Sequence, residues 1–505
     1  MMHQNPCFPF ISMRDFLENL ERTGNVLDIE AMNQDRYELT AFLHKLWKER
    51  GLEAPVIRIK NLTQGGRTYD MPVVTNLLGN YRHLGLAFGA KLTAHVPLSS
   101  YYADLYDCMV AKLARVQAGD LISKQEIAEA DAPCKDRVLM GSAVDLFELP
   151  VIQHYPVDAG RYITTGMVIL EDPELGVNVA TCRIQVQGPR KANVYFNYGS
   201  HSMSFCERAK KRGSKTISVA VAIGSDPVSW VFSGARLCSL GVDELAAAGT
   251  VMGQPFQVTK CETSDLRVPA HAEFIIEGTI DLERLEPEGP FMEVFDRLGY
   301  SPAEGTHVID VTALTHRADP IYYATWMGCT PRESSVYAGM PFTIASHLAA
   351  IRSNPNIVRI YRPAESKWHM VIISIDKKLP GDGMQAALSF LGQVGYGTMV
   401  KIAIVVDRDV NPSSWPEVLD ALASHWQPIP GSLMMPQMKG WELDHTTRVH
   451  GITSKIIIDA TRQFPQEGGP ERSDPTGVDV MQKLAPDTIA WIEKTWPDFW
   501  QSQED

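Results

Sequence analysis

The sequence predicts a mixed α/β and β fold, with α/β regions at both ends of the chain and a strand-rich region between them. From about residue 145 to residue 316, most segments are β-branched or alternate in polarity, with Gly, Pro and Asp between them, a pattern typical of a barrel or sandwich. On either side, strand patterns alternate with helical ones, as in α/β domains. Because 505 residues exceed what one hydrophobic core accommodates, we place three domains at 1–125, 126–320 and 321–505.

The N-terminal region combines amphipathic helices with short apolar strands. Apolar residues recur at helical spacing in residues 13–23, 34–50 and 101–116. They form strand-like segments in residues 25–30 and 55–60. The polar stretch that follows, up to about residue 136, is a candidate domain boundary.

The central region holds seven candidate strands and two short helices. The helices are expected at residues 203–211 and 243–252. The strands are expected at residues 162–170, 178–186, 192–197, 216–223, 256–262, 272–280 and 307–314.

The C-terminal region returns to an α/β pattern. Residues 370–376 and 401–407 are near-continuous apolar runs, typical of parallel strands that are buried on both faces. Helical patterns accompany them at residues 341–353, 384–393 and 415–426. A final helix at 487–496 follows a Gly/Pro/Asp-rich arm, and tryptophans 491, 496 and 500 give it an apolar surface. We expect this helix to dock, with a partner subunit as the candidate surface.

Composition and charge exclude several classes of protein. The net charge is −13 and the sequence pI is about 5.6, which argues against nucleic acid or an anionic membrane as the main partner. The basic run at residues 208–215 is interpreted as a solvated helix end. The eight cysteines show no C-x-x-C pair, which favours a reducing compartment. Neither a signal peptide nor an apolar run of membrane-spanning length is found, so we expect a cytoplasmic protein.

A turn in the central region carries two carboxylates, in the sequence Glu288-Gly-Pro-Phe-Met-Glu293. Its Gly-Pro pair is incompatible with a helix interior. Two carboxylates that converge in an enclosed site do not both ionise readily, and an arginine between them would keep one charged while the other exchanges a proton. Arg183, which is set among apolar neighbours, is the candidate arginine. Spacing alone nevertheless favours an acidic surface turn.

Asn178, His201 and Glu244 form a candidate metal site. An amide oxygen, an imidazole and a carboxylate suit Mn²⁺ or Mg²⁺ better than zinc, particularly where a phosphate completes the shell. Taken singly, each residue has an ordinary structural explanation as a turn residue, a capped histidine or the exposed face of a helix. Lys401, at the mouth of an apolar strand, could contact a phosphate or simply end the strand in solvent. The motifs of phosphate-binding loops, zinc proteases, α/β-hydrolases and dinucleotide-binding folds do not occur.

Taken together, these residues resemble the UbiD family of prenylated-FMN-dependent reversible decarboxylases, over nearly the whole chain. Order and spacing agree with the family at several places at once. The marks are Asn178-x4-Arg183, His201, Asp243-Glu244-Leu245, Val268-Pro-Ala-x-Ala-Glu273-x3-Glu277-Gly278, Glu288-Gly-Pro-x-x-Glu293 and Asp407-Arg-Asp409-Val410.

The resemblance implies the architecture and the assembly of the protein. The central domain would be a flavin-reductase-like split β-barrel that binds prenylated FMN. An α/β domain would lie on each side of it in the sequence. The C-terminal domain and its terminal helix would form a homodimer or a homohexamer.

The resemblance also implies roles for the site residues. Arg183, Glu288 and Glu293 would form the catalytic network, with Glu293 as proton donor. Mn²⁺ or Mg²⁺, bound by Asn178, His201 and Glu244, would bridge to the cofactor phosphate. A K⁺ ion can accompany such a site, with ligands that the resemblance does not place. The cofactor contacts expected in the wider site are Asn178, Ala180, Thr181, Cys182, Arg183, Ser200, His201, Glu244 and Lys401.

The implied reaction is the reversible, non-oxidative decarboxylation of an aromatic or heteroaromatic (α,β-unsaturated) carboxylic acid. It would proceed through a covalent substrate–flavin adduct and release CO₂, with a flavin prenyltransferase supplying the cofactor. Met292 departs from the usual E-G-P-F-G-E turn and leaves the substrate open. Met292, Trp326, Met327 and Cys329 are candidates for the pocket wall or for the core. Two other classes remain open: an FMN-dependent oxidoreductase on a split barrel, and a non-catalytic flavin-binding protein.

Overall fold

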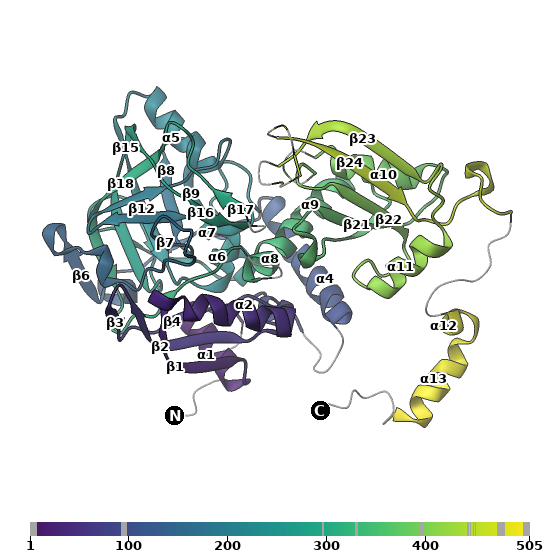
Figure 1. Ribbon diagram of the computed structural model, residues 1–505, viewed down its shortest axis with the longest axis horizontal. Helices are drawn as coiled ribbons and strands as arrows, with labels where there is room; N and C mark the ends of the chain where they lie inside the picture. The colour runs from purple at the N-terminus through teal and green to yellow at the C-terminus, as the bar shows by residue number, and fades with distance from the viewer. Residues whose placement is uncertain are drawn as a thin grey trace. The chain divides into compact units, whose positions relative to one another are not determined.

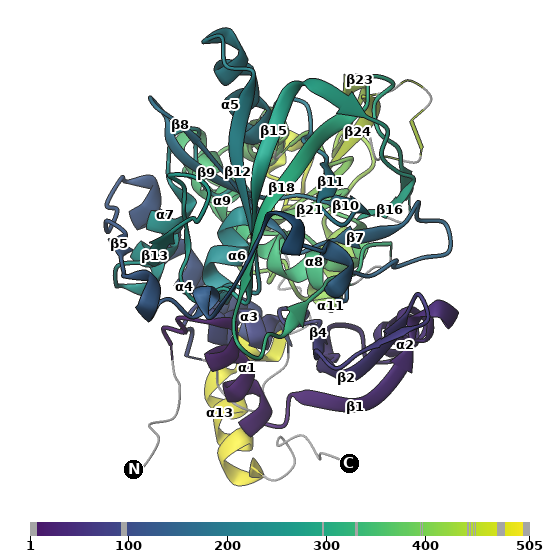
Figure 2. The same cartoon turned by 90° about the vertical axis from the view of Figure 1, so that its left-hand side faces the viewer.

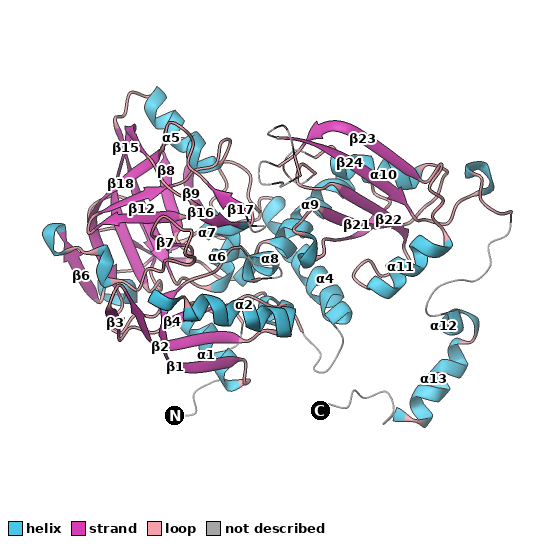
Figure 3. Cartoon of the chain, in the orientation of Figure 1, coloured by secondary structure: helices cyan, strands magenta, loops and turns pink. Residues whose placement is uncertain are grey.

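A computed structural model describes residues 8–91, 98–294, 297–328, 332–393, 395, 397–441, 444, 446, 447, 449, 451–471 and 480–497. The chain divides into two compact units. The first comprises Met1–Lys91 and Asp107–Phe342, and the second Leu92–Tyr106 and Thr343–Asp505. Both units combine helices with sheets (Figures 1 and 3), as predicted. The finer division into three domains stays a prediction.

The first unit begins with a small sheet and the helices α1 to α4, of which α4 contributes its residues up to Tyr106 to the second unit. α1 (Met13–Arg22) is capped by Ser12, whose hydroxyl accepts a hydrogen bond from the Asp15 backbone, and it buries one apolar face. The sheet has the order β1-β2-β4-β19, with β3 paired to β2, and α2 contacts β1. The bounds are β1 Val26–Asn33, α2 Glu38–Arg50, β2 Val56–Gln64, β3 Arg67–Tyr69, β4 Val73–Thr75, α3 Tyr81–Ala87, α4 Leu98–Gln117 and β19 Tyr322–Tyr323.

The larger sheet of this unit curls into an open half-barrel, which Figure 2 shows face-on. Its strand order is β7-β10-β11-β18-β15-β12-β8-β9, and β6 adds to β18. All pairings along this path are antiparallel. The bounds are β6 Arg137–Met140, β7 Arg161–Ile163, β8 Met167–Asp172, β9 Gly176–Thr181, β10 Ile184–Gly188, β11 Lys191–Val194, β12 Thr216–Ile223, β15 Phe274–Glu286 and β18 Thr306–His316.

Two segments that were predicted as single strands are each divided into two strands, so these predictions were wrong in their bounds. Each segment is interrupted where the chain crosses between the two ends of this sheet. Residues 162–170 divide into β7 and β8, and residues 178–186 into β9 and β10. β7 and β9 are the two ends of the strand order, so residues 164–166 and 182–183 cross the gap between them. We call these two crossing segments the seam. They are joined by a hydrogen bond from the Cys182 backbone nitrogen to the Gly166 carbonyl, at 3.3 Å.

The helices α5 to α8 and two small sheets complete the first unit. α5 packs on β8, β9 and β12, while α6 packs on α7 and β9. α6 was not predicted, although Asp226 caps it and Pro227 occupies its first turn. The bounds are β5 Gln125–Glu126, α5 His201–Lys211, α6 Pro227–Gly234, α7 Glu244–Met252, β13 Gln257–Lys260, β14 Arg267–Pro269, β16 Phe291–Glu293, β17 Arg297–Gly299 and α8 Glu333–Tyr337.

The second unit is built on a five-stranded sheet of order β20-β21-β22-β24-β23. The central strands β21, β22 and β24 run parallel and supply Val371, Ile373, Ala403, Val405 and Ile457 to the core. This confirms the buried parallel strands that the sequence predicts. The bounds are α9 Gly339–Ser353, β20 Ile357–Tyr361, β21 Met370–Ile375, α10 Asp382–Leu391, β22 Ile402–Asp407, α11 Trp415–Ser424, β23 Ser432–Lys439 and β24 Ile452–Asp459.

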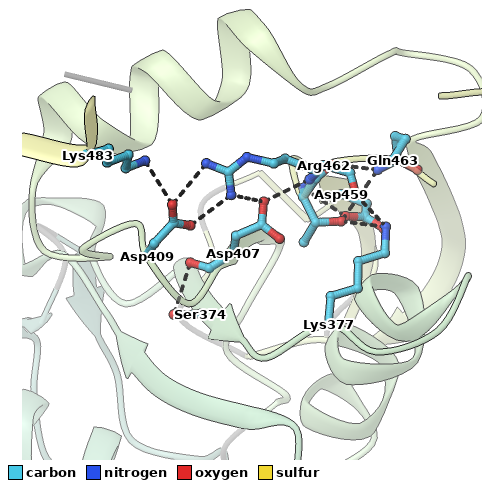
Figure 4. Close-up of polar contacts among 9 residues, drawn as sticks. Ser374, Lys377, Asp407, Asp409, Asp459, Arg462, Gln463 and Lys483 are labelled. Carbon is cyan, nitrogen blue, oxygen red and sulfur yellow. Dashed lines mark hydrogen bonds and ion pairs between the residues drawn. The ribbon is translucent and has the colours of Figure 1, made fainter. Parts of the chain in front are cut away.

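Charged residues follow the carboxyl ends of these parallel strands (Figure 4). Arg462 binds Asp407 and Asp409, at 3.2 and 2.9 Å, and Lys483 reaches Asp409 at 2.8 Å. The last contact ties α12 (Val480–Leu484) to the sheet. In α13 (Pro486–Thr495) and directly after it, Trp491 and Trp496 are 57% and 45% exposed. Docking of this helix on a partner subunit stays a prediction, and Trp500 lies outside the described residues.

Candidate functional site

The two crossing segments of the seam border a cavity of about 300 Å³ in the first unit. Ligand pockets in proteins have volumes of this order and upward. One group of its lining residues is Arg183, Glu293, Phe291, Tyr195 and Met327. A second group of lining residues, which we call the metal end, is Asn178, Ser200, His201 and Glu244. Two groups that the sequence analysis singled out separately therefore lie in one cavity.

Arg183 joins the two carboxylates of the predicted turn. Its Nη2 donates to Glu288 Oε2 at 2.8 Å, and its Nη1 donates to Glu293 Oε1. The side chains of Arg183 and Glu288 are 8% and 0% exposed, whereas that of Glu293 is 18% exposed and reaches the cavity. The acidic surface turn that spacing alone favoured is therefore wrong. The charges lie inside, and the two carboxylates differ in their access to a ligand.

The electrostatics of the pair follow from burial. Burial by itself lowers the pKa of the Arg183 guanidinium, but Glu293 and Glu288 outweigh this effect and raise the pKa above its usual value. The Arg183 guanidinium also lies over the ring of Tyr195, 4.3 Å from its centroid. Arg183 is therefore held as a fixed cation.

The turn itself is held from both sides. Asp158 is buried, and its carboxylate accepts hydrogen bonds at 2.8 Å from the backbone nitrogens of Met292 and Tyr155. Burial raises the pKa of Asp158 to about 6, against these backbone hydrogen bonds. On the other side, a Cβ at Gly299 would lie 2.6 Å from Glu293 Cγ and 2.7 Å from Arg183 Nη1. Glycine is therefore required at Gly299 for the ion pair to form in this position.

The metal end is built from two helix N-termini. His201 begins α5 behind the cap Ser200, and Glu244 begins α7 behind the cap Asp243. Asn178 lies on β9, and its amide nitrogen donates a hydrogen bond to the Ser202 hydroxyl at 3.1 Å. Its amide oxygen is therefore the atom that would bind a cation. Helix N-termini also favour an anion such as a phosphate.

These donors fit a hard divalent metal. Glu244 is 5% exposed and accepts a hydrogen bond from the Val179 backbone at 2.8 Å. Burial raises the pKa of Glu244 to about 8, so a bound cation would be needed to keep it ionised at neutral pH. An amide oxygen, an imidazole nitrogen and a carboxylate are suitable ligands for Mn²⁺ or Mg²⁺. The three side chains predicted as ligands therefore border one cavity with a donor set of the expected chemistry.

The remaining predicted cofactor contacts divide between the units. Ala180, Thr181 and Cys182 line the cavity, and the hydroxyl of Thr181 is 2.7 Å from that of Ser233. Lys401 belongs to the second unit, where its Nζ donates to Asp444 Oδ1 at 3.0 Å. Its contact with a cofactor stays a prediction.

The structure also adds residues that the sequence did not indicate. Tyr195, Arg236 and Tyr337 line the cavity. Of the apolar candidates, Met327 lines it, whereas Trp326 is fully buried in the core and Cys329 lies outside the described residues. No local pattern marks Tyr195 or Tyr337, because their positions depend on long-range packing. Arg236 follows a helix that was itself not predicted.

Comparisons with known proteins agree with this geometry. Models of the three domains of the 3-octaprenyl-4-hydroxybenzoate carboxy-lyase family, UbiD, match residues 17–102 (N-terminal domain), 125–331 (Rift-related domain) and 337–460 (C-terminal domain). The chain belongs to the UbiD family, and it is a carboxy-lyase. The predicted mixed fold with a central split barrel is thereby confirmed.

Individual relatives extend over nearly the whole chain. Proteins described as uncharacterized from Archaeoglobus fulgidus and Aquifex aeolicus are both 32% identical, covering 95% and 91% of this chain and 98% and 94% of their own. The UbiD-class enzyme HmfF from Pelotomaculum thermopropionicum, solved in complex with FMN, is 28% identical with a TM-score of 0.78, covering 94% of this chain and 99% of its own. Vanillic acid decarboxylase from Sedimentibacter hydroxybenzoicus, solved in an open form, is 25% identical with a TM-score of 0.81. The match covers 96% of this chain and 99% of that enzyme's chain.

Proposed function

We propose that this protein is a prenylated-FMN-dependent enzyme that reversibly decarboxylates an aromatic or heteroaromatic (α,β-unsaturated) carboxylic acid. The observation that carries the proposal is the Glu288–Arg183–Glu293 arrangement in the same cavity as Asn178, His201 and Glu244. HmfF, which has the same fold, has been solved with FMN and with prenylated FMN. In this proposal the residues that line the cavity would hold the modified flavin, and those of the metal end would serve its phosphate.

The protein residues have distinct roles in the proposed reaction. Arg183 binds and orients the substrate carboxylate, because a guanidinium presents a planar pair of donors. Glu288, fully buried behind Arg183, keeps the guanidinium in place. Glu293 is the carboxyl group at the cavity wall, and it donates a proton to the carbon that has lost CO₂. When bound, prenylated FMN supplies the electron sink for the bond cleavage.

The metal and the remaining contacts complete the proposal. Asn178, His201 and Glu244 would bind Mn²⁺ or Mg²⁺ next to the cofactor phosphate. K⁺ as a companion ion and a phosphate contact from Lys401 belong to the same proposal. We further propose a cytoplasmic homodimer or homohexamer that obtains its cofactor from a flavin prenyltransferase. Among the described residues, no helix combines the length and the apolar character that crossing a bilayer requires.

The residues that line the cavity and the structural relatives support the proposed class of substrate. Phe291, Tyr195 and Met327 give an apolar and aromatic surface beside Arg183, which suits a planar ring with a carboxylate. Vanillic acid decarboxylase supports an aromatic acid. Met292 packs against the hydrophobic core. Its side chain also lies close to the backbone of Gly328, because a Cβ added to Gly328 would lie 2.4 Å from Met292 Cγ. We propose that Met292 shapes the pocket through Met327 and Gly328.

Glu293→Gln tests the proposed function. The full-length chain is co-expressed with a flavin prenyltransferase, and aromatic and heteroaromatic acids are screened for CO₂ release. The variant should retain bound flavin and lose ~10²–10⁴-fold in turnover, the usual contribution of a positioned acid. Glu304→Gln, at an exposed loop position, is the matched control and should keep full activity. Turnover of the Glu293→Gln variant at the wild-type rate would show that Glu293 is not the proton donor. Flavin reduction by a nicotinamide without CO₂ release would instead favour the oxidoreductase.

A further inference from the structure

Arg236 has a backbone conformation that arginine rarely adopts. It is the second residue after α6, beyond the cap Ala235, and its φ is +49°. This is the left-handed position that usually follows a helix, where glycine or asparagine is normal. A residue with a Cβ is strained there, because the Cβ comes too close to the following carbonyl oxygen. Strained residues of this kind concentrate at functional sites, so the side chain deserves a functional explanation.

The side chain borders the same cavity as the catalytic and metal-binding residues. Arg236 lines the cavity together with Ser233, Gly234 and Cys238, which surround it in the sequence. Burial of Cys182 raises the pKa of its thiol, and the Arg236 charge acts in the opposite direction, so the guanidinium lies within electrostatic range of the seam. Arg236 is therefore a cation at the cavity wall, on the loop that leads from α6 toward α7.

The charged groups that line the cavity indicate the function of the Arg236 guanidinium. Arg183, the other arginine in the cavity wall, is shared between Glu288 and Glu293. At the metal end, the N-termini of α5 and α7 add partial positive charge. A guanidinium that lines the same cavity as two helix N-termini and a divalent-metal donor set suits a dianionic phosphate, which an arginine binds through paired donors.

We propose that Arg236 binds the phosphate of the flavin mononucleotide cofactor, in addition to the metal. This inference rests on the proposed function, because it needs a flavin phosphate in the cavity. It assigns a binding residue that no motif in the sequence marks. It also explains why an arginine occupies a position that glycine would fill with less strain.

The test compares two flavins that differ only in the phosphate. The full-length chain is expressed without a prenyltransferase, stripped of flavin and supplied with Mn²⁺. Affinities for FMN and for riboflavin are then measured by fluorescence quenching. Arg236→Gln should weaken FMN binding by about 10- to 100-fold, the range for losing a charge-assisted hydrogen bond, and should leave riboflavin binding unchanged. Lys211→Gln, which removes an exposed charge from α5, is the matched control and should leave both affinities unchanged.

Arg236→Gly separates a binding role from a structural one. Glycine relieves the left-handed strain, so the melting temperature of the flavin-free variant should equal or exceed that of the wild type. Its FMN affinity should nevertheless fall as in Arg236→Gln. A lower melting temperature with unchanged FMN affinity would overturn the inference and make Arg236 a structural residue. Equal losses for FMN and riboflavin, or an effect on the KM for the acid alone, would also overturn it. Failure of the wild type to bind FMN would instead count against the proposed function.

Discussion

Replacing Arg183 with methionine tests whether this arginine holds the two carboxylates in one site. Its side chain is 8% exposed and lies between Glu288, at 0%, and Glu293, at 18%. Removal of Arg183 leaves a fully buried carboxylate without this guanidinium. Breaking a buried ion pair by removing one partner costs ~3–5 kcal/mol. We expect the free energy of unfolding of the first unit to fall by that amount in Arg183→Met.

The two carboxylates provide graded comparisons. Glu288→Gln should cost about 1–3 kcal/mol, because it removes a charged hydrogen-bond acceptor but still fills the space. Glu293→Gln should cost at most about 1 kcal/mol, because partial exposure lets water screen the pair. In the double variant Arg183→Met/Glu288→Gln the isolated buried charge is gone, so about 1–2 kcal/mol of the loss should be recovered.

The assay is urea unfolding of the flavin-free, full-length chain, followed by hydrogen exchange of peptides from the first unit. Peptide resolution is needed because a chain with two compact units does not unfold as one two-state system. The reasoning is refuted if Arg183→Met costs no more than Glu293→Gln. It is also refuted if the double variant is no more stable than Arg183→Met alone.

Three further predictions follow from the described contacts. Burial lowers the pKa of His154 to about 3. The contribution of the neutral imidazole to the free energy of unfolding is therefore complete above about pH 6.5 and is lost as the pH falls toward 3. At pH 5 the free energy of unfolding should be lower by about 2 kcal/mol, and this decrease should be absent in His154→Phe. Gly299→Ala places a methyl group 2.6 Å from Glu293 Cγ and should lower kcat by about 10²-fold through displacement of the proposed catalytic pair, Arg183 and Glu293. Lys455→Met leaves three carbonyls, of Gly397, Thr398 and Val400, without the donor that now reaches them at 2.6–3.1 Å, and should destabilise the second unit by about 3 kcal/mol.

Each of these has its own measurement and control. Urea unfolding at pH 5 and pH 7 checks His154, and an unchanged pH dependence in His154→Phe would contradict the assignment. Steady-state turnover checks Gly299, with Gly188→Ala as control, since its Cβ would meet Lys191 at an ordinary 3.6 Å. Unfolding of the second unit checks Lys455, with the exposed Lys439→Met on the neighbouring strand as control. Equal effects of the two lysine substitutions would show that the buried carbonyls do not depend on Lys455.

Much of the fold could be predicted because its signals are local. The apolar runs of β21 and β22 and the periodicity of α1 are properties of a few adjacent residues. The interruptions at the seam could not be predicted in this way. Residues 178–186 read as one β-branched run, and only the curl of the sheet requires the chain to cross between its ends at Cys182 and Arg183.

The candidate site shows the same division. The identities of Arg183, Glu288, Glu293, Asn178, His201 and Glu244 could be proposed from motifs and their spacing. Spacing did not determine whether the acidic turn faces solvent or the interior, because that depends on which strands close over it. The contributions of Asp158, Gly299, Tyr195 and Arg236 depend on contacts between residues far apart in the chain.

The sequence by itself determined most of the element types, the family resemblance and the chemical character of the proposed catalytic and metal-binding residues, because these reside in side-chain identity and short-range pattern. Only the tertiary structure decided which carboxylate is sealed behind Arg183 and which one meets the cavity. It also decided that a strained arginine lines the same cavity as the proposed metal ligands. The physical reason is that burial and charge pairing are properties of the packed chain, and they set the ionisation and reach of each side chain.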